Sequence, residues 1–252
     1  MSPGERRVCL LTGAGGVLGD GFCRALHTEY DIVAVHRTRV PSVPSQHEWF
    51  VDPFQPDAAV PDNDSRVHLI NADLSRPGEV ERVVDLALAR FGRVDLLVNN
   101  AAHVDHRPNG LIDGDAALDG FEPTFGMNVG VPLRMSTRLA QRGWLHDRAA
   151  NLARNRNIVN ISCASGAKVY PGVQALYAAS KAALNHLTRH MAAEFTEFGV
   201  RVNALAPYNF PEVVPVENVL HAIYQLDSGT MTGGIFDVDA TAAAPQADTG
   251  SA

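Results

Sequence analysis

The fold of this chain is decided by residues 8–19, which read Val8-Cys9-Leu10-Leu11-Thr12-Gly13-Ala14-Gly15-Gly16-Val17-Leu18-Gly19. The four apolar residues at the start predict a short strand that is buried on both faces, and the glycines end it. A helical pattern then runs from Gly19 to Tyr30. A buried strand, a glycine turn and a helix make the first half of a β-α-β unit, so this stretch predicts a parallel sheet.

The rest of the chain repeats this alternation. Apolar runs predict strands at Asp31–His36, Arg66–Asn71, Val94–Asn99, Ile158–Ser162, Arg201–Ala204 and Gly234–Val238, and helical patterns predict helices at Glu79–Phe91, Asp119–Gln141, Leu176–Phe198 and Glu217–Gln225. We therefore expect an α/β fold, a doubly wound parallel sheet of the Rossmann type with about seven strands and helices on both faces. We also expect a single domain over residues 1–240, a surface loop over the proline-rich residues 40–64, and a disordered tail over 241–252.

Composition and charge narrow the function classes. The 252 residues carry a formal net charge of −7 and no run of Lys and Arg, which argues against a nucleic-acid partner. The three cysteines, Cys9, Cys23 and Cys163, are odd in number and widely spaced, so we expect neither a disulfide framework nor a zinc site. No apolar stretch reaches the ~18 residues of a membrane span, and there is no signal-peptide core. These features predict a cytoplasmic protein with no metal and no membrane partner.

The glycine turn predicts a dinucleotide site. Glycines there let the backbone approach a pyrophosphate, which lies at the N-terminus of the following helix. We expect the cofactor-binding residues to include Thr12, Gly13, Gly15, Gly16, Val17, Leu18 and Gly19. The second predicted strand ends at His36 and Arg37, with Arg39 close behind and no acid to bind a ribose 2′-hydroxyl. Cations would pair with a 2′-phosphate and favour NADP(H); NAD(H) is the alternative, with both arginines as solvated loop charges.

The sequence Tyr177-Ala178-Ala179-Ser180-Lys181 places a phenol and an ammonium on one face of a predicted helix. A phenol with its ordinary pKa near ~10 is a poor acid–base catalyst at neutral pH, but a nearby cation favours the phenolate. The pair therefore predicts an acid–base group that gives or takes the proton of a carbonyl/alcohol substrate.

Together these motifs resemble the short-chain dehydrogenase/reductase family over about residues 6–239. The family's glycine loop reads Thr-Gly-x-x-x-Gly-x-Gly; Thr12, Gly13 and Gly19 match it, and Val17 stands at the middle glycine. The stretch Asn99-Asn100-Ala101-Ala102 resembles the family's Asn-Asn-Ala-Gly. The Tyr177–Lys181 segment, preceded by Ile158-Val159-Asn160-Ile161-Ser162, resembles its catalytic signature.

The resemblance implies a role for further residues. Lys181 would hold the nicotinamide ribose, and Asn128 would support a water relay to that lysine. The remaining cofactor contacts would come from Asp73, Leu74, Asn100, Ala101, Ala102 and Pro207. For Asp73 the alternative is a helix N-cap for the residues from Ser75 onward.

The position of the family's catalytic serine is occupied by Cys163, with Ser162 before it and Ser165 after it. A thiol is a weak hydrogen-bond donor, so it would polarise a carbonyl less than a hydroxyl does. Three interpretations stay open. One of the serines is turned into the site, Cys163 does the work poorly, or the chemistry differs.

The segment after the sixth strand is short. Only 24 residues separate Pro207 from Thr232, where the family has a longer helical lid. This predicts an open cleft, suited to a bulky or carrier-bound carbonyl/alcohol substrate. The resemblance also implies a homodimer or homotetramer formed through the two long helices.

The leading prediction is an NAD(P)-dependent oxidoreductase that transfers a hydride between nicotinamide and a carbonyl/alcohol substrate, with Tyr177 as acid/base. Two alternatives are a catalytically idle dinucleotide-binding sensor or scaffold, and a non-redox elimination or epimerisation on the same fold.

Overall fold

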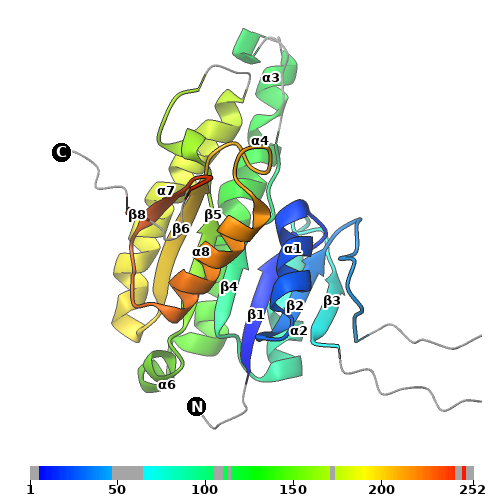
Figure 1. Cartoon of the computed structure of the whole chain (residues 1–252), viewed down its shortest axis with the longest axis vertical. Coiled ribbons are helices and arrows are strands. Elements are labelled where there is room, and N and C mark those ends of the chain that lie inside the picture. Colours follow the sequence, from blue (N-terminus) through cyan, green and yellow to red (C-terminus); the bar gives the residue numbers. More distant parts are fainter. Residues whose placement is uncertain are drawn as a thin grey trace, which may run out of the picture.

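A single sheet forms the centre of the fold. The computed structural model describes residues 6–46, 65–104, 110–112, 115–170, 174–241 and 246–247, and within them the sheet has eight strands. They are β1 (Arg7–Thr12), β2 (Tyr30–His36), β3 (Val67–Asn71), β4 (Leu96–Asn99), β5 (Asn157–Ile161), β6 (Arg201–Pro207), β7 (Ile235–Val238) and β8 (Gln246–Ala247). The order is β3-β2-β1-β4-β5-β6-β7-β8; β1 to β7 run parallel, and β8 pairs antiparallel with β7 (Figure 1). The expected Rossmann-type sheet of seven parallel strands is confirmed.

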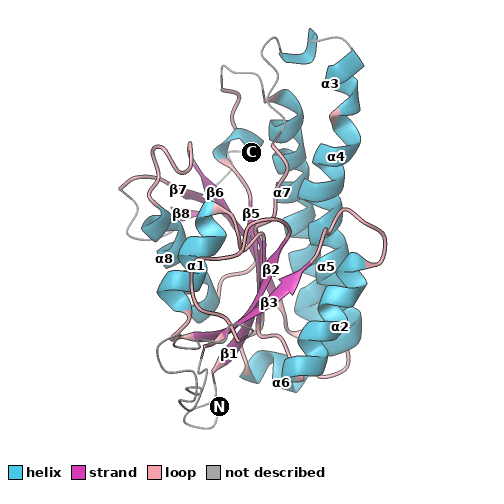
Figure 2. Cartoon of the chain, turned by 90° about the vertical axis from the view of Figure 1, so that its right-hand side faces the viewer, coloured by secondary structure: helices cyan, strands magenta, loops and turns pink. Residues whose placement is uncertain are grey.

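Helices cover both faces of this sheet. They are α1 (Val17–Leu26), α2 (Glu79–Phe91), α3 (Asp115–Asp119), α4 (Phe121–Phe125), α5 (Val131–Leu139), α6 (Arg148–Ala153), α7 (Ala175–Phe195) and α8 (Val216–Ser228). Figure 2 shows α1 and α8 on one side of the sheet and α2, α5 and α7 on the other. The chain therefore has the three layers that a parallel sheet needs to bury both its faces.

The two cores follow from the alternation of side chains along the strands. In β1, Val8 and Leu10 pack into the core under α2, α5 and α7, whereas Cys9 and Leu11 pack into the core under α1 and α8. All four side chains are fully buried. A strand covered on both faces must be apolar at every position, which is why this run predicted the fold.

The helix predicted over Asp119–Gln141 is confirmed by an unbroken helical stretch over residues 121–144. Within it, a π-helical turn at Gly126–Gly130 lies between α4 and α5, and a second one follows α5 at Ala140–Trp144. Pro132 accounts for the first π-helical turn. A proline inside a helix donates no amide hydrogen, and its ring crowds the carbonyl four residues earlier, which belongs here to Asn128. The wider turn relieves this crowding and fixes where Asn128 lies.

Three expectations concern segments outside the sheet. Of the predicted loop over residues 40–64, only 40–46 are described, and they form no helix or strand. The predicted tail over 241–252 is described only at Thr241 and at the two residues of β8; the rest of it lies outside the described residues. The helix predicted at Glu217–Gln225 is confirmed as α8, which packs into the core under the sheet with α1 and does not act as a lid.

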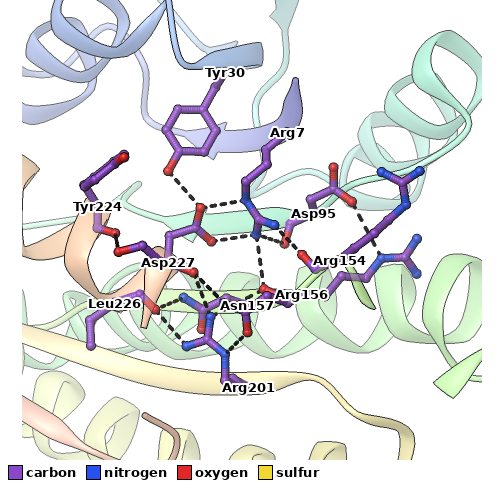
Figure 3. A network of polar contacts seen from close by, with 12 residues as sticks. Arg7, Tyr30, Asp95, Arg154, Arg156, Asn157, Arg201, Tyr224, Leu226 and Asp227 are labelled. Atoms are coloured by element: carbon purple, nitrogen blue, oxygen red, sulfur yellow. Dashed lines mark hydrogen bonds and ion pairs between the residues drawn. The ribbon is translucent and has the colours of Figure 1, made fainter. Parts of the chain in front are cut away.

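Charged groups at the amino ends of the strands form a buried network (Figure 3). Arg7 begins β1, Tyr30 begins β2, and Asp227 lies in the last turn of α8. The Asp227 carboxylate is 2% exposed and accepts hydrogen bonds of 2.8 Å from Arg7 Nε, from Arg7 Nη2 and from the Tyr30 hydroxyl. This network joins the sheet to α8 at the edge opposite the one where such folds bind ligands.

Candidate active site

The carboxyl ends of the parallel strands bring the predicted site residues to one edge of the sheet. Thr12 ends β1, His36 ends β2, Asn100 follows β4, Ser162 follows β5, and Pro207 ends β6. In open α/β sheets, ligands bind at this edge, beside the point where the strand order reverses. That point lies here between β1 and β4.

The glycine loop is fastened to the end of β4 by Thr12 and Asn100. The Thr12 hydroxyl accepts hydrogen bonds from the backbone amides of Asn100 (2.9 Å) and Ala101 (3.0 Å). The side-chain amide of Asn100 donates to the backbone carbonyls of Thr12 (3.0 Å) and Gly13 (3.1 Å). Thr12 is buried and Asn100 is half-buried, and their hydrogen bonds set the shape of the loop.

Three glycines of the loop are required by its geometry, and one of them is Gly19, where a Cβ would overlap the carbonyl oxygen of Gly13. Gly13 has a φ of +69°, and a Cβ there would lie 2.9 Å from the Cα of Ala101. A Cβ at Gly15 would overlap the backbone carbonyl of Arg39, so the loop after β2 lies directly against the glycine turn. Gly16 is the N-cap of α1, and Gly19 lies inside the helix. The glycine turn thus leads straight into the helix N-terminus, which is the cradle that a pyrophosphate needs.

Val17 and Leu18 begin α1 with opposite environments. Leu18 is buried in the core under α1 and α8, so its side chain does not face the loop. Val17 is 51% exposed at the first turn of the helix. A branched apolar side chain therefore stands exposed at the position where the resemblance implies a glycine, which is the least favourable feature of the loop for a dinucleotide.

Cationic side chains lie on the loop after β2. Arg37 and Arg39 are exposed, and the side-chain amide of Asn71 donates a 2.6 Å hydrogen bond to the Arg37 carbonyl. His36 is buried, and burial lowers its pKa, which favours the neutral imidazole. An accessible cation at the end of the second strand is the feature expected of a site that binds the 2′-phosphate of NADP(H).

Asp73 has a local structural role. Its carboxylate accepts hydrogen bonds from the Ser75 hydroxyl (2.6 Å) and amide (3.1 Å), which stabilise a turn. The helix N-cap given above as the alternative is not found, because α2 begins only at Glu79 and its N-cap is Gly78. Those bonds from Ser75 lower the Asp73 pKa, and the charges of Arg37 and Arg76 lower it further. Arg37 is therefore close enough to Asp73 to lower the pKa of that carboxyl group. The Leu74 side chain is buried in the core.

Tyr177 lies in the first turn of α7, close to Cys163. Burial raises the pKa of Tyr177, and the neighbouring Cys163 raises it further. This shift is opposite to the direction expected from a nearby ammonium, because burial disfavours the charged phenolate. Tyr177 is therefore a protonated phenol at neutral pH.

Lys181 lies one turn further along α7 and is 2% exposed. Its ammonium donates a 2.8 Å hydrogen bond to the carbonyl of Ile161, at the end of β5, and sits 5.4 Å from the centre of the Tyr177 ring. Burial lowers the Lys181 pKa to about 8, although Cys163 acts in the opposite direction. A buried cation under a phenol is the pairing that the spacing of four residues predicted.

The environment of Cys163 distinguishes it from the two neighbouring serines. The Ser162 hydroxyl is buried and donates a 2.5 Å hydrogen bond to the Asn185 side chain. The Ser165 hydroxyl is buried and has no hydrogen-bond partner among the described residues. Cys163 is half-buried and is the one of the three whose side chain meets Tyr177.

Asn128 is fully buried in the π-helical turn before α5. Its side-chain oxygen accepts from the His103 amide (2.7 Å), and its side-chain nitrogen donates to the His103 carbonyl (2.9 Å) and to the Ser180 hydroxyl (2.9 Å). The Ser180 hydroxyl donates in turn to the carbonyl of Tyr177 (2.7 Å). Asn128 therefore ties the segment after β4 to α7, and its hydrogen bonds go to His103 and Ser180, not to Lys181.

Sequence reasoning missed three residues that organise this site. Asn185 lies four residues after Lys181, so helical spacing along α7 could have revealed it as a continuation of the same face. Ser180 stands inside the Tyr177–Lys181 segment without a role assigned to it. His103 gave no signal, because it acts only through its backbone.

Comparison with known proteins adds an independent finding. A family model described as short chain dehydrogenase matches residues 7–213. Nodulation protein G of Rhizobium meliloti (strain 1021) is 29% identical over 80% of this chain and 72% of its own length. Secoisolariciresinol dehydrogenase of Forsythia intermedia is 28% identical over 82% of this chain and 67% of its own length.

A solved structure shows the same fold. The 3-ketoacyl-(acyl-carrier-protein) reductase from Brucella melitensis, complexed with NADH, superposes with a TM-score of 0.74 at 24% identity. The match covers 94% of this chain and 98% of that one.

None of the helices in the described residues is long and apolar enough to cross a membrane. The described residues also contain no group of three or more His, Cys, Asp or Glu residues that could hold a metal ion.

Proposed function

The chain belongs to the short-chain dehydrogenase/reductase family of oxidoreductases, and from this premise we propose that it reduces a carbonyl substrate with NADPH. The observation that carries the proposal is the group at the carboxyl edge of the sheet. In it a protonated Tyr177 meets Cys163 on one side, and the Lys181 ammonium lies beneath its ring. The glycine turn at the N-terminus of α1 suits a dinucleotide, despite the exposed Val17.

The protein groups have distinct tasks in this proposal. A bound nicotinamide supplies the hydride. Tyr177 donates its proton to the substrate oxygen, and its raised pKa keeps that proton in place at neutral pH until the oxygen becomes basic. Lys181 places a buried cation beside the resulting phenolate. Asn128 acts as a positioning residue, because it holds the first turn of α7 through Ser180.

NADP(H) is favoured over NAD(H) by Arg37, and a fluorescence titration tests this. We expect NADPH to bind more tightly than NADH, and Arg37→Ala to weaken NADPH binding by about 10- to 100-fold, the value of a hydrogen bond to a charged group. The binding of NADH should stay unchanged. Arg76→Ala is the matched control, because Arg76 is also an exposed arginine that lies beside Asp73. A wild-type preference for NADH would contradict the proposal for the cofactor but not for the reaction.

Cys163 supplies a second test. A hydroxyl is a stronger donor than a thiol. Removing one hydrogen-bond donor to the substrate oxygen lowers kcat by about 10²–10³-fold. Cys163→Ser replaces a weak donor by a stronger one, so we expect it to raise kcat by a smaller factor, about tenfold. Ser162→Ala is the control, because its hydroxyl is engaged with Asn185 and its loss should reduce stability by about 1 kcal/mol without changing kcat. An inactive Cys163→Ser variant would show that the thiol itself is needed.

The substrate is proposed to be a bulky or carrier-bound carbonyl compound. Tyr170 and Tyr208 lie in the segments after β5 and β6 and are partly exposed, and their rings are inclined by 50° with their centres 5.2 Å apart. An aromatic pair at the same edge of the sheet as Tyr177 suits an apolar substrate. A homodimer or homotetramer is likewise proposed, through the long helix α7 and its exposed alanines.

A catalytically idle dinucleotide binder is the second candidate, and it is favoured by Cys163, a weak hydrogen-bond donor at the position of the family's catalytic serine. Oxidation of NADPH by a library of ketones separates the two functions. Tight NADPH binding without turnover of any member would favour the idle binder. Product formed without net NADPH consumption would instead indicate an elimination or epimerisation.

A further inference from the structure

Two histidines project from successive turns of α7. His186 and His190 are four residues apart, and both are exposed. Their Nε2 atoms lie 3.2 Å from each other, and the two rings are inclined by 73° with their centres 4.7 Å apart. The nitrogens that a metal ion would use therefore already converge on one point outside the helix.

The separation of these nitrogens matches the requirement of a shared ion. An imidazole nitrogen binds zinc at about 2.0–2.1 Å, so two nitrogens on one ion lie about 2.9 Å apart at a right angle and about 3.4 Å apart at a tetrahedral angle. The observed 3.2 Å falls between these values. Two histidines at this helical spacing are also the arrangement by which a single helix supplies two zinc ligands.

We propose that His186 and His190 form a two-imidazole site for a divalent transition-metal ion of the zinc, nickel or copper type. Imidazole nitrogen suits all three of these ions, and the general affinity order places copper highest. Because the described residues offer no group of three ligands, water or a second copy of the chain must complete the coordination. The site is separate from the proposed catalytic group, although the same helix carries both.

Binding of an ion would also brace the helix. The chelate would join two successive turns of α7, and it can form only where the helix is folded. An ion that binds only the folded chain stabilises it by mass action. At an ion concentration a hundred times the Kd, this should raise the Tm of a chain of this size by about 5–10 °C.

The test is a calorimetric titration of the untagged full chain with ZnCl₂, NiCl₂ and CuSO₄. We expect saturable binding with copper tightest, at one ion per chain, or one ion per two chains if a second copy completes the site. Removing an outer-shell partner of a metal ligand already weakens binding by about 10- to 100-fold. His186→Ala and His190→Ala should each therefore weaken binding by at least about tenfold and abolish the rise in Tm.

His146→Ala is the matched control, because His146 is an exposed histidine with no histidine at the same spacing. It should bind the ions as the wild type does. Electron paramagnetic resonance of the copper-loaded wild type should show coupling to two nitrogens, which each single variant reduces to one. Equal affinities in the wild type and both single variants, or no saturable binding at all, would overturn the proposal. Neither readout depends on enzymatic activity.

Discussion

Replacing Tyr177 by Phe is expected to lower kcat for carbonyl reduction by about 10²–10⁴-fold, the usual contribution of a positioned acid or base. The change removes one oxygen atom and leaves the ring in place over Lys181, so NADPH binding and Tm should change little. The measurement is the rate of NADPH oxidation with a ketone that the wild type turns over. The same preparation should be titrated with NADPH to show that the variant still binds it.

Tyr208→Phe is the matched control for this experiment. It makes the same chemical change in an exposed tyrosine that follows β6 at the same edge of the sheet. We expect its kcat to stay within about twofold of the wild type, since no proton transfer is assigned to it. Turnover that survives in Tyr177→Phe at the wild-type rate would remove Tyr177 from the mechanism.

Most of the fold could be predicted from the sequence, because the central strands are covered by helices on both faces and are therefore largely apolar. Val8–Leu11 could be recognised as such a strand because its four residues are all apolar. The parallel sheet followed from the alternation of such strands with helices. The π-helical turn before Val131 was not predicted. A helical pattern does not show whether Pro132 will bend, break or widen the helix around it, because that depends on how the neighbouring elements pack.

The sequence predicted which residues belong to the candidate site, but not which of their side chains contact one another. Cys163 could be assigned to the serine position by alignment, but the sequence could not tell which side chain turns toward Tyr177. That choice depends on Asn185, which engages the hydroxyl of Ser162. The pKa of Tyr177 was predicted in the wrong direction for a similar reason. Spacing along the helix places a charge nearby but says nothing about the depth at which the phenol is buried.

Polar contacts between residues far apart in the chain could not be predicted from the sequence. Arg7 and Asp227 are 220 residues apart, and neither stands in a recognisable motif. They meet because the first strand begins and the last helix ends at the same edge of the sheet. Burial lowers the pKa of Arg7, but the carboxylate of Asp227 more than offsets this, and the pKa is raised overall.

Replacing Asp227 by Asn should therefore produce the largest loss of stability among the predicted variants. The substitution keeps the shape of the side chain but leaves the mostly buried Arg7 guanidinium without its counter-charge. Breaking a buried ion pair by removing one partner costs about 3–5 kcal/mol. For a chain of this length, that corresponds to a fall in Tm of about 6–20 °C. Chemical and thermal denaturation would measure it.

Asp85→Asn provides the control for Asp227→Asn, because Asp85 pairs with Arg142 on the surface, where both side chains are about half exposed. Its loss should cost no more than about 1 kcal/mol. The double variant Arg7→Met with Asp227→Asn should recover part of the lost stability, since it no longer buries an unpaired charge. Because the network lies at the edge of the sheet opposite Tyr177, the folded fraction of Asp227→Asn should keep the wild-type kcat. A fall in kcat at full folding, or a loss of stability no larger than that of Asp85→Asn, would contradict this account of the network.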